Sequence, residues 1–462
     1  NEVKTMAQAF FGGVHPHDMK AATNEKAIEQ LAPPAVVVIP MSMHFGAPCT
    51  PLVKAGDHVK VGQKIGEFHG LGAPIHASVS GTVKAVEPRP YSMGGNITSV
   101  VIENDMQDEV SEEVQAPADP NALSVEEMVE IVKNAGIVGM GGATFPTHVK
   151  ITSGIGKVNT VIINGAECEP YITGDHRTML ERPEEIIGGA KFLAKMFGVD
   201  KVVIGVEDNK RNGIDAMNKV IAEQKAPVVV EPLRCRYPQG GEKQLCQAIT
   251  GRQVPPGGLP ADIGCAVFNI NTTCAIYRAL TTGMPVVRKI VTVSGSGVVE
   301  PKNLECPIGT PVSSLLDACG GLKDGTYKLI AGGPMMGMAQ YTADISVAKG
   351  TGAILAFCEN EEKTVENPQC IRCGKCVSVC PMHLEPLFMY QYASKGMVEE
   401  LNDAHIMDCM ECGACSYICP ARMHLTHMFK TGKQLVKDKA AADRAAAEAK
   451  KKAEEAKEAA AK

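Results

Sequence analysis

The sequence contains no tryptophan, and aromatic residues make up only 4% of its 462 positions. Proteins that bind single-stranded nucleic acid stack bases on aromatic side chains, so this composition disfavours that class. The 46 basic residues do not outnumber the 52 acidic ones, which leaves no cationic excess for a phosphate backbone. No apolar run approaches the roughly 18 residues of a membrane-spanning helix. A length of 462 residues allows about three domains, and 45% hydrophobic residues can form their cores.

The first ten residues also lack the basic and then apolar pattern of a secretory leader. Residue 1 is not Met, so the native start is left open. Cysteine, in contrast, is abundant, with 17 residues. An odd number of cysteines without a leader favours a reducing compartment and metal ligation over disulfides. Nine of the cysteines are scattered, and for these we expect free structural thiols.

The other eight cysteines form the strongest chemical motif, C-x-x-C-x-x-C-x-x-x-C-P, which occurs twice. This spacing is typical of [4Fe–4S] ferredoxins, in which the fourth cysteine of each run ligates the other cluster. Zinc is the alternative, but zinc sites separate two short cysteine pairs by a longer loop. We therefore predict two [4Fe–4S] clusters with crossed ligands. The ligand sets are Cys370, Cys373, Cys376 and Cys419 for cluster 1, and Cys409, Cys412, Cys415 and Cys380 for cluster 2.

The rest of the chain changes character several times. Short strands broken by Gly and Pro fill residues 30–105, and their two half-repeats resemble the barrel-sandwich fold of lipoyl carriers. The tip between the halves, 68–72, has no lysine to acylate, so we expect a structural module. Alternating helices and strands from 124 predict a layered α/β sheet, with a helix over 183–197. Residues 384–401 read as mostly helical between the two cysteine runs.

Four blocks within the α/β region carry glycine, acid and amide side chains. They are Gly136–Thr147, Asn164–Pro170, Tyr237–Lys243 and Asn269–Thr272. A glycine-rich loop alone is a weak signal, although dense glycine lets backbone amides approach a phosphate or a flavin ring. It is not the dinucleotide fingerprint, which follows a strand and opens a helix.

In their order, these blocks resemble the NADH-oxidising flavoprotein subunit of respiratory complex I. With the early Gly12-Gly13-Val14-His15-Pro16 and the paired cysteine runs, the chain more closely resembles the RnfC subunit of Rnf ion-translocating ferredoxin:NAD oxidoreductase complexes. This resemblance covers nearly the whole chain except the Ala-rich tail. It departs from the complex I pattern at Met140, Thr144 and Ala166.

The resemblance implies a multidomain α/β and α+β architecture. Its parts are a barrel-sandwich module, a Rossmann-like FMN- and NADH-binding domain, a β-grasp (SLBB-like) domain, a ferredoxin-like domain and an Ala-rich helix. The expected boundaries are 1–29 (N-terminal segment), 30–105 (barrel-sandwich), 106–123 (linker), 124–287 (flavin domain), 288–360 (β-grasp), 361–435 (two-cluster domain) and 436–462 (charged helix).

The same resemblance assigns roles to single residues. Gly139, Gly141 and Gly142 would cover FMN, with Lys150 near its polar edge. Asn164 and Glu167 would hydrogen-bond the flavin or its ribityl chain. The phosphate side would be surrounded by Gly240, Gly241, Asn269 and Thr272. The nicotinamide nucleotide would be held by Phe145, Glu169 and Glu242.

Each of these acids could instead cap a helix or solvate a loop. The histidines His15, His17 and His44 are scattered, and we expect them to be structural. No nucleophile or triad is predicted, because a flavin carries the chemistry.

The implied function is transfer of electrons from reduced ferredoxin, delivered by other Rnf subunits, through both clusters and FMN to NAD⁺. Membrane partners would couple this to Na⁺ or H⁺ movement. The chain is therefore expected to be a peripheral subunit on the cytoplasmic face of the membrane, without a transmembrane helix. Two alternatives are the diaphorase subunit of a soluble NAD-linked hydrogenase or formate dehydrogenase, and a ferredoxin-like relay without flavin.

Overall fold

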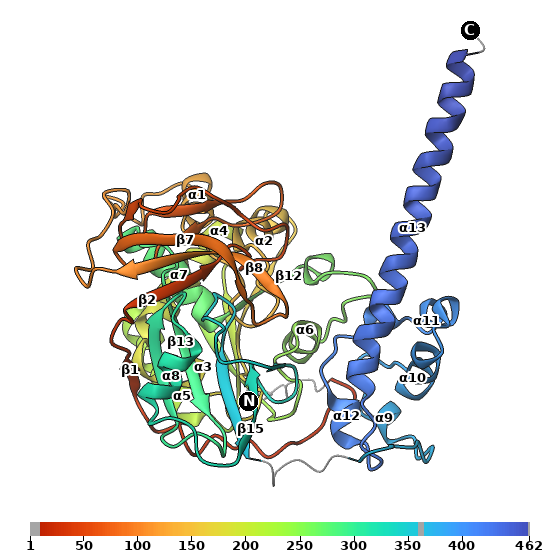
Figure 1. The fold of residues 1–462 in the computed structure, drawn as a ribbon. Coiled ribbons are helices and arrows are strands. Elements are labelled where there is room, and N and C mark those ends of the chain that lie inside the picture. The colour runs from red at the N-terminus through yellow and green to blue at the C-terminus, as the bar shows by residue number, and fades with distance from the viewer. Residues whose placement is uncertain (1–9, 359–364, 461–462) are drawn as a thin grey trace. The chain divides into compact units, whose positions relative to one another are not determined.

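The computed structural model describes residues 10–358 and 365–460, with side chains up to residue 452. The chain divides into two compact units. Of the described residues, 15–358 form the large unit, whereas 10–14 and 365–460 form the cysteine unit. Figure 1 colours the chain from its N-terminus to its C-terminus. The five residues 10–14 therefore belong with the C-terminal part of the chain and not with their sequence neighbours.

The centre of the large unit is a parallel sheet of four strands. Its spatial order is β11 (Val228–Leu233), β10 (Val202–Glu207), β9 (Thr160–Gly165) and β12 (Cys265–Asn269). Every neighbouring pair is parallel. The central strand β9 holds Val161, Ile162 and Ile163, all fully buried, as expected for a strand covered on both faces.

Helices connect and cover these strands. Those of the α/β region are α1 (Val125–Asn134), α2 (Thr147–Gly154), α3 (Gly174–Glu181), α4 (Pro183–Phe197), α5 (Arg211–Gln224), α6 (Glu242–Thr250) and α7 (Ile270–Thr282), with a 3₁₀ turn η1 (Pro260–Ile263). Ser124 and Glu127 form a capping box at the start of α1. The predicted helix over 183–197 is confirmed as α4, which begins with a proline and ends before Gly198 in a left-handed conformation.

The order of strands creates a switch point. From β9 the chain proceeds outward through β10 and β11, and then returns to place β12 on the other side of β9. The chain segments that leave the carboxyl ends of β9 and β12 therefore run in different directions. In open α/β sheets, ligands bind in the crevice at such a switch point. Here that edge is formed by the residues after Gly165 and by Asn269, the N-cap of α7.

Two antiparallel sheets form the module over residues 30–105. The first contains β2 (Val36–Pro40), β8 (Asn96–Asn104), β7 (Gly81–Pro90) and β4 (His58–Val59); the second contains β3 (Thr50–Pro51), β5 (Lys64–Glu67) and β6 (Ile75–His76). Ile39, Ile65 and Ile75 are fully buried in the shared core. The lysine-free tip 68–72 joins β5 to β6.

A six-stranded sheet with one helix completes the large unit. Its order is β1 (Ile28–Gln30), β14 (Lys302–Pro307), β13 (Arg288–Ser294), β17 (Ala353–Cys358), β15 (Thr326–Ala331) and β16 (Met338–Gln340), with helix α8 (Val312–Ala318). Strand β1 comes from the N-terminal segment and pairs in parallel with β14. The sequence did not predict this long-range pairing.

The cysteine unit is helical. It contains α9 (Lys375–Ser378), α10 (Pro386–Ser394), α11 (Val398–Asp403), the 3₁₀ turn η3 (Ile406–Asp408), α12 (Ala414–Ile418) and α13 (Leu425–Ala460). The helical stretch expected over 384–401 is two helices, because the chain turns at Gly396 with φ +66°.

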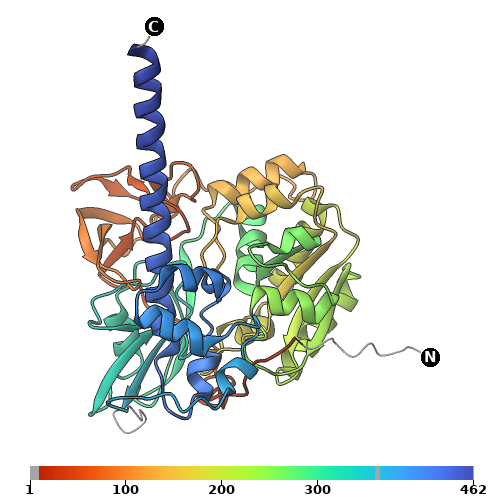
Figure 2. The same ribbon diagram turned by 90° about the vertical axis from the view of Figure 1, so that its right-hand side faces the viewer.

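The tail helix is longer than predicted. It begins at Leu425, so its 36 residues extend about 54 Å, and Figures 1 and 2 show it as one long rod within its unit. Leu425, Phe429 and Val436 are buried near its start, whereas residues 437–452 are exposed.

Close packing of α4 on α7 gives the first prediction. A Cβ on Gly189 would lie 2.2 Å from the carbonyl oxygen of Thr273, which is a steric clash. Gly189→Ala should therefore destabilise the large unit by about 1–2 kcal/mol, despite the better helix propensity of alanine. Thermal unfolding of the full chain measures this. Lys191→Ala, on the exposed face of α4, is the matched control, and equal melting temperatures for both variants would contradict the packing.

Candidate functional site

The eight predicted cluster ligands separate into two groups in the cysteine unit. One hollow of about 440 Å³, counted with the solvent it opens to, is lined by Cys370, Cys373, Cys376 and Cys419. A second hollow of about 360 Å³ is lined by Cys380, Cys409, Cys412 and Cys415. Each hollow thus receives three cysteines from one run and the fourth from the other. This is the grouping that the spacing predicted; the ligand roles themselves stay predictions.

The two runs also share their backbone geometry. Gly374 and Gly413, the N-caps of α9 and α12, have φ of +74° and +79°. At the residue two before each glycine, the N–H donates to a cysteine sulfur: Arg372 N to Cys370 Sγ and Glu411 N to Cys409 Sγ, each at 3.4 Å. Amides that bond to sulfur are a feature of iron–sulfur sites, where they tune the reduction potential.

The chemistry of the thiols fits clusters as well. Burial raises the pKa of Cys409 to about 11 and that of Cys412 to about 12. Such thiols stay protonated at neutral pH unless a bound cation compensates the thiolate charge. Among the described residues, 10–358 and 365–460, no group of three or more His, Cys, Asp or Glu side chains has the geometry to hold a single metal ion.

The early glycine motif belongs to this unit. Gly13 N donates to the carbonyl oxygen of Val379 at 2.8 Å, and a Cβ on Gly12 would lie 2.7 Å from the same oxygen. The ring of Phe11 stacks on His383 with centroids 4.4 Å apart. Residues 10–14 therefore pack on the turn that carries Cys380, and only glycine allows that approach. The sequence indicated the motif but not its place.

In the large unit, the predicted flavin residues gather at the switch point. The glycine loop lies against the start of α7: a Cβ on Gly141 would lie 3.2 Å from Asn269, and Met140 N donates to Thr272 Oγ1 at 2.9 Å. Gly139 N donates to the carbonyl oxygen of Phe145 at 2.9 Å and closes the loop. A Cβ on Gly142 would meet only open space.

A second group lies beside it, at the start of α6. Asn164, at the end of β9, donates to the carbonyl oxygen of Gly240 at 2.8 Å. Lys150 forms an ion pair of 2.7 Å with Glu242, and both side chains remain partly exposed. Gly241 is the N-cap of α6. The N-terminus of a helix favours anions, so α6 and α7 both offer positions for a phosphate.

An aspartate that the sequence analysis missed joins these groups. Asp175, in the first turn of α3, accepts from Asn269 Nδ2 at 2.8 Å and from Asn271 Nδ2 at 2.5 Å. Its own N–H donates to Glu167 Oε1 at 2.6 Å. Burial raises the pKa of Asp175, and Lys289 opposes that rise. Asp175 therefore links the loop after β9 to the N-cap of α7.

Glu167 and Glu169 both lie in the loop after β9, but in different surroundings. The Glu167 side chain is 4% exposed, and its Oε2 has no hydrogen-bond partner among the described residues, although Lys20 lies 3.7 Å away. Both oxygens of Glu169 accept backbone hydrogen bonds, from Met335 N at 3.1 Å and Met336 N at 3.0 Å. The loop beside β15 thus occupies Glu169, and a role in nucleotide binding stays a prediction.

Unsatisfied polar atoms beside the glycine loop fit a bound flavin nucleotide. The amide Nε2 of Gln239, adjacent to Gly240, is buried without a hydrogen-bond partner among the described residues. Glu167 Oε2 is a second unsatisfied polar atom near the loop. Buried polar atoms without partners are costly, and an oxygen- and nitrogen-rich ligand would satisfy them. Gly142 leaves room for the approach of such a ligand.

The histidines show no common site. His15 and His17 are exposed, whereas His44 is buried and its Nε2 lies 2.9 Å from the carbonyl oxygen of Ala47. Burial lowers the pKa of His44, so its ring is neutral. His44 thus has a structural contact, and the structural role expected of His15 and His17 stays a prediction.

Titration of Glu167 gives the second prediction. Burial raises its pKa from 4.5 to about 7, although Lys20 opposes the rise. Folding therefore favours the neutral acid, and the stability this contributes is present below pH 4.5 and lost as pH rises through about 7. The loss is on the order of 3 kcal/mol. Glu167→Gln should reduce the fall in melting temperature between pH 5 and pH 8.

Exposed Glu184 of α4 supplies the control for that measurement. Glu184→Gln should keep the wild-type pH dependence. An unchanged pH dependence in Glu167→Gln would show that Glu167 is ionised at all these pH values.

Comparisons with known proteins follow the same division of the chain. Four family models match it: the RnfC barrel sandwich hybrid domain over residues 8–107, the Nuo51 FMN-binding domain over 132–278, the SLBB domain over 290–339, and a 4Fe-4S dicluster domain over 363–420. The expected fold class is confirmed by these matches. The expected boundaries between domains stay predictions.

Relatives match over most of their length. The C subunit of the Na(+)-translocating ferredoxin:NAD(+) oxidoreductase complex of Acetobacterium woodii is 45% identical over 86% of this chain and 90% of its own. The C subunit of the proton-translocating complex of Clostridium ljungdahlii is 43% identical over 87% of this chain and 88% of its own.

A solved NAD+-reducing [NiFe]-hydrogenase has a TM-score of 0.47 and 18% identity over 69% of this chain and 64% of its own, too weak a likeness to support an argument. The described part of the chain has no helix with the length and apolarity needed to span a bilayer. On the identity and coverage of its relatives, the chain belongs to the RnfC family, the C subunits of ion-translocating ferredoxin:NAD(+) oxidoreductase complexes.

Proposed function

We propose that this chain is the peripheral subunit through which a membrane-bound ferredoxin:NAD⁺ oxidoreductase complex exchanges electrons with NAD(H). The electrons would pass from partner subunits through two [4Fe–4S] clusters to FMN and then to NAD⁺, reversibly. The observation that carries the proposal is the crossed arrangement of eight cysteines around two hollows, in a chain whose other unit has an FMN-binding fold.

The chemistry requires a mediator between two kinds of carrier. Nicotinamide exchanges two electrons as a hydride and each cluster exchanges one, and bound FMN can do both. The protein residues orient the cofactor and the nucleotide and screen them from water. Asn164, Glu167 and Asn269 would hold the cofactor at the carboxyl ends of β9 and β12, and the glycine loop 139–142 would cover it. We infer that Phe145 and Glu242 line the nucleotide side of the site. Phe145 closes the glycine loop through its hydrogen bond with Gly139, and Glu242 is the first residue of α6.

Partners would supply membrane attachment and ion movement. The two relatives are subunits of complexes named for different ions, Na⁺ and the proton, at 45% and 43% identity to this chain. We propose that the chain docks on the membrane subunits of such a complex at the cytoplasmic face.

The crossed ligand sets give the third prediction. Replacing Cys419 should remove the same cluster as replacing Cys370, and replacing Cys380 should remove the same cluster as replacing Cys409. Each Cys→Ser variant should lose iron and paramagnetic signal from one cluster only, because four thiolates hold each cubane. Iron analysis and paramagnetic resonance of the reduced, anaerobic protein would measure this. If Cys380→Ser gave the spectrum of Cys370→Ser, the crossing would be wrong.

The order of carriers gives the fourth prediction. The full chain reconstituted with FMN, iron and sulfide should show flavin bleaching on addition of NADH. Cys370→Ser and Cys409→Ser should retain that bleaching but lose electron transfer to a one-electron acceptor. Cys235→Ser changes an exposed cysteine outside both groups and should behave as wild type. Absence of flavin bleaching in the wild type would overturn the proposal, and full onward transfer in the cluster variants would overturn the order.

A further inference from the structure

The loop at residues 166–172 follows β9 and has no regular secondary structure. Two of its non-glycine residues have left-handed backbone angles, with φ of +47° at Glu167 and +69° at Tyr171. Such angles cost free energy in residues with a side chain, and they persist only where the surroundings hold them. In the described part of the chain, its carbonyl groups also accept no backbone hydrogen bonds from a neighbouring strand or helix. Side chains must therefore stabilise the loop conformation.

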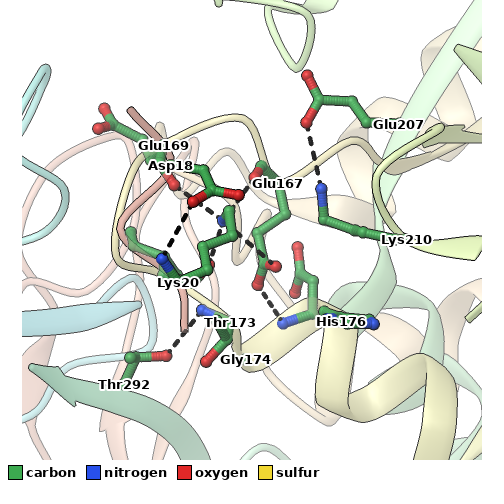
Figure 3. A network of polar contacts seen from close by, with 12 residues as sticks. Asp18, Lys20, Glu167, Glu169, Thr173, Gly174, His176, Glu207, Lys210 and Thr292 are labelled. Carbon is green, nitrogen blue, oxygen red and sulfur yellow. Dashed lines mark hydrogen bonds and ion pairs between the residues drawn. The ribbon is translucent and has the colours of Figure 1, made fainter. Parts of the chain in front are cut away.

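A lysine from the N-terminal segment supplies the missing contacts. Lys20 Nζ donates to the carbonyl oxygens of Glu167 and Glu169, each at 3.0 Å, and to that of Ile172. An ammonium group has three N–H donors, so these bonds use all of them. The Glu167 carboxylate lies 3.7 Å from the same nitrogen. Figure 3 shows Lys20 reaching into this loop.

Neighbouring contacts reinforce this arrangement. Tyr171 N donates to the carbonyl oxygen of Asp18 at 2.8 Å, and Lys20 N lies 3.4 Å from Asp18 Oδ1. Lys210 Nζ donates to the carbonyl oxygen of Ala166 at 2.7 Å and pairs with Glu207 at 3.1 Å. Four loop carbonyls thus accept hydrogen bonds from two ammonium groups. Both lysines are buried, with Lys20 5% and Lys210 1% exposed.

Burying the charged ammonium groups of Lys20 and Lys210 costs free energy of desolvation. The hydrogen bonds that they donate to the loop carbonyls offset part of this cost. Desolvation lowers the pKa of Lys20, although Glu167 opposes this. An apolar side chain would fill the space without that cost but would leave three carbonyls unsatisfied. The loop carries Glu167 and Glu169, and its Cys168 Sγ accepts from Gly240 N at 3.2 Å. Fixing the loop therefore also fixes the segment around Gly240.

We propose that Lys20 is a positioning residue of the flavin site: it holds loop 166–172 in the conformation that receives FMN and balances the charge of Glu167. The inference rests on the proposed function. Lys20 does not itself contact the reacting atoms; it acts through the loop and its carboxylate. Because FMN carries an anionic phosphate, FMN affinity should fall as pH rises and Glu167 ionises.

The test compares two lysine variants in the full chain with reconstituted clusters. Lys20→Met should weaken FMN binding about tenfold to a hundredfold, measured by fluorescence titration of the flavin-free protein. Lys26→Met is the control, because Lys26 lies in the same segment and makes one exposed bond to the carbonyl oxygen of Pro301. It should bind FMN within about twofold of wild type. Cluster spectra, which report on the other unit, should be unchanged in both variants.

The pH dependence of FMN binding separates positioning from general damage. The charged groups around Glu167 are Lys20, Asp175 of α3 and Lys210 before α5, with Lys289 of β13 next to Asp175. Loss of Lys20 removes a cation, so the pH at which affinity falls should move upward in Lys20→Met. In Glu167→Gln, the fall in affinity that follows ionisation of Glu167 should be absent.

The outcomes are distinct. Wild-type affinity in Lys20→Met, or an unshifted pH profile, would overturn the inference. A wild-type protein that binds no FMN would instead overturn the proposed function. If Lys20→Met does not fold, as judged by the loss of the thermal unfolding transition of the large unit, Lys20→Arg is measured in its place: it keeps the charge but cannot reproduce three convergent bonds. Weaker FMN binding by the arginine variant would support positioning, and wild-type affinity would contradict it.

Discussion

Parallel pairing of β9 on both sides constrains the candidate site. A strand that is bonded to β10 and β12 and covered on both faces has room only for apolar side chains, so Val161, Ile162 and Ile163 fill it. Polar chemistry is displaced to the carboxyl end, where the chain leaves the ladder and its peptide groups lose their partners. The loop 166–172 is the result, and buried charges substitute for the missing ladder.

Those charges nearly cancel. Lys20 faces Glu167, Lys210 faces Glu207, and Asp175 lies near Lys289. Each ion would be costly alone in such surroundings, and each pair offsets part of that cost. The balance has a chemical consequence: removing any one member leaves its partner buried and uncompensated. A site built this way is rigid but sensitive to single substitutions.

The sequence predicted those features that depend on short-range patterns. Cysteine spacing gave both sets of four cysteines, and the alternation of helices and strands gave the helix over 183–197. The glycine and amide blocks gave the switch-point residues through their order. Contacts between distant residues left no pattern to read. Lys20 is 147 residues from Glu167, and nothing around it distinguishes it from a surface lysine. Asp175 was likewise hidden in the first turn of a helix.

The two units therefore hold their groups by different physical means. In the cysteine unit, each hollow is built from two short runs whose turns repeat the same left-handed angles, at Gly374 and Gly413. Burial raises the pKa of Cys409 and Cys412, so these two thiols need a bound cation to ionise at neutral pH. Much of its organisation is thus expected to follow cluster binding. In the large unit, the predicted flavin residues are held by packing and by the buried ions Lys20, Asp175, Lys210 and Lys289, which come from four separate segments. The candidate flavin site is consequently a product of the fold, whereas the predicted cluster sites are expected to depend in part on the clusters that they bind.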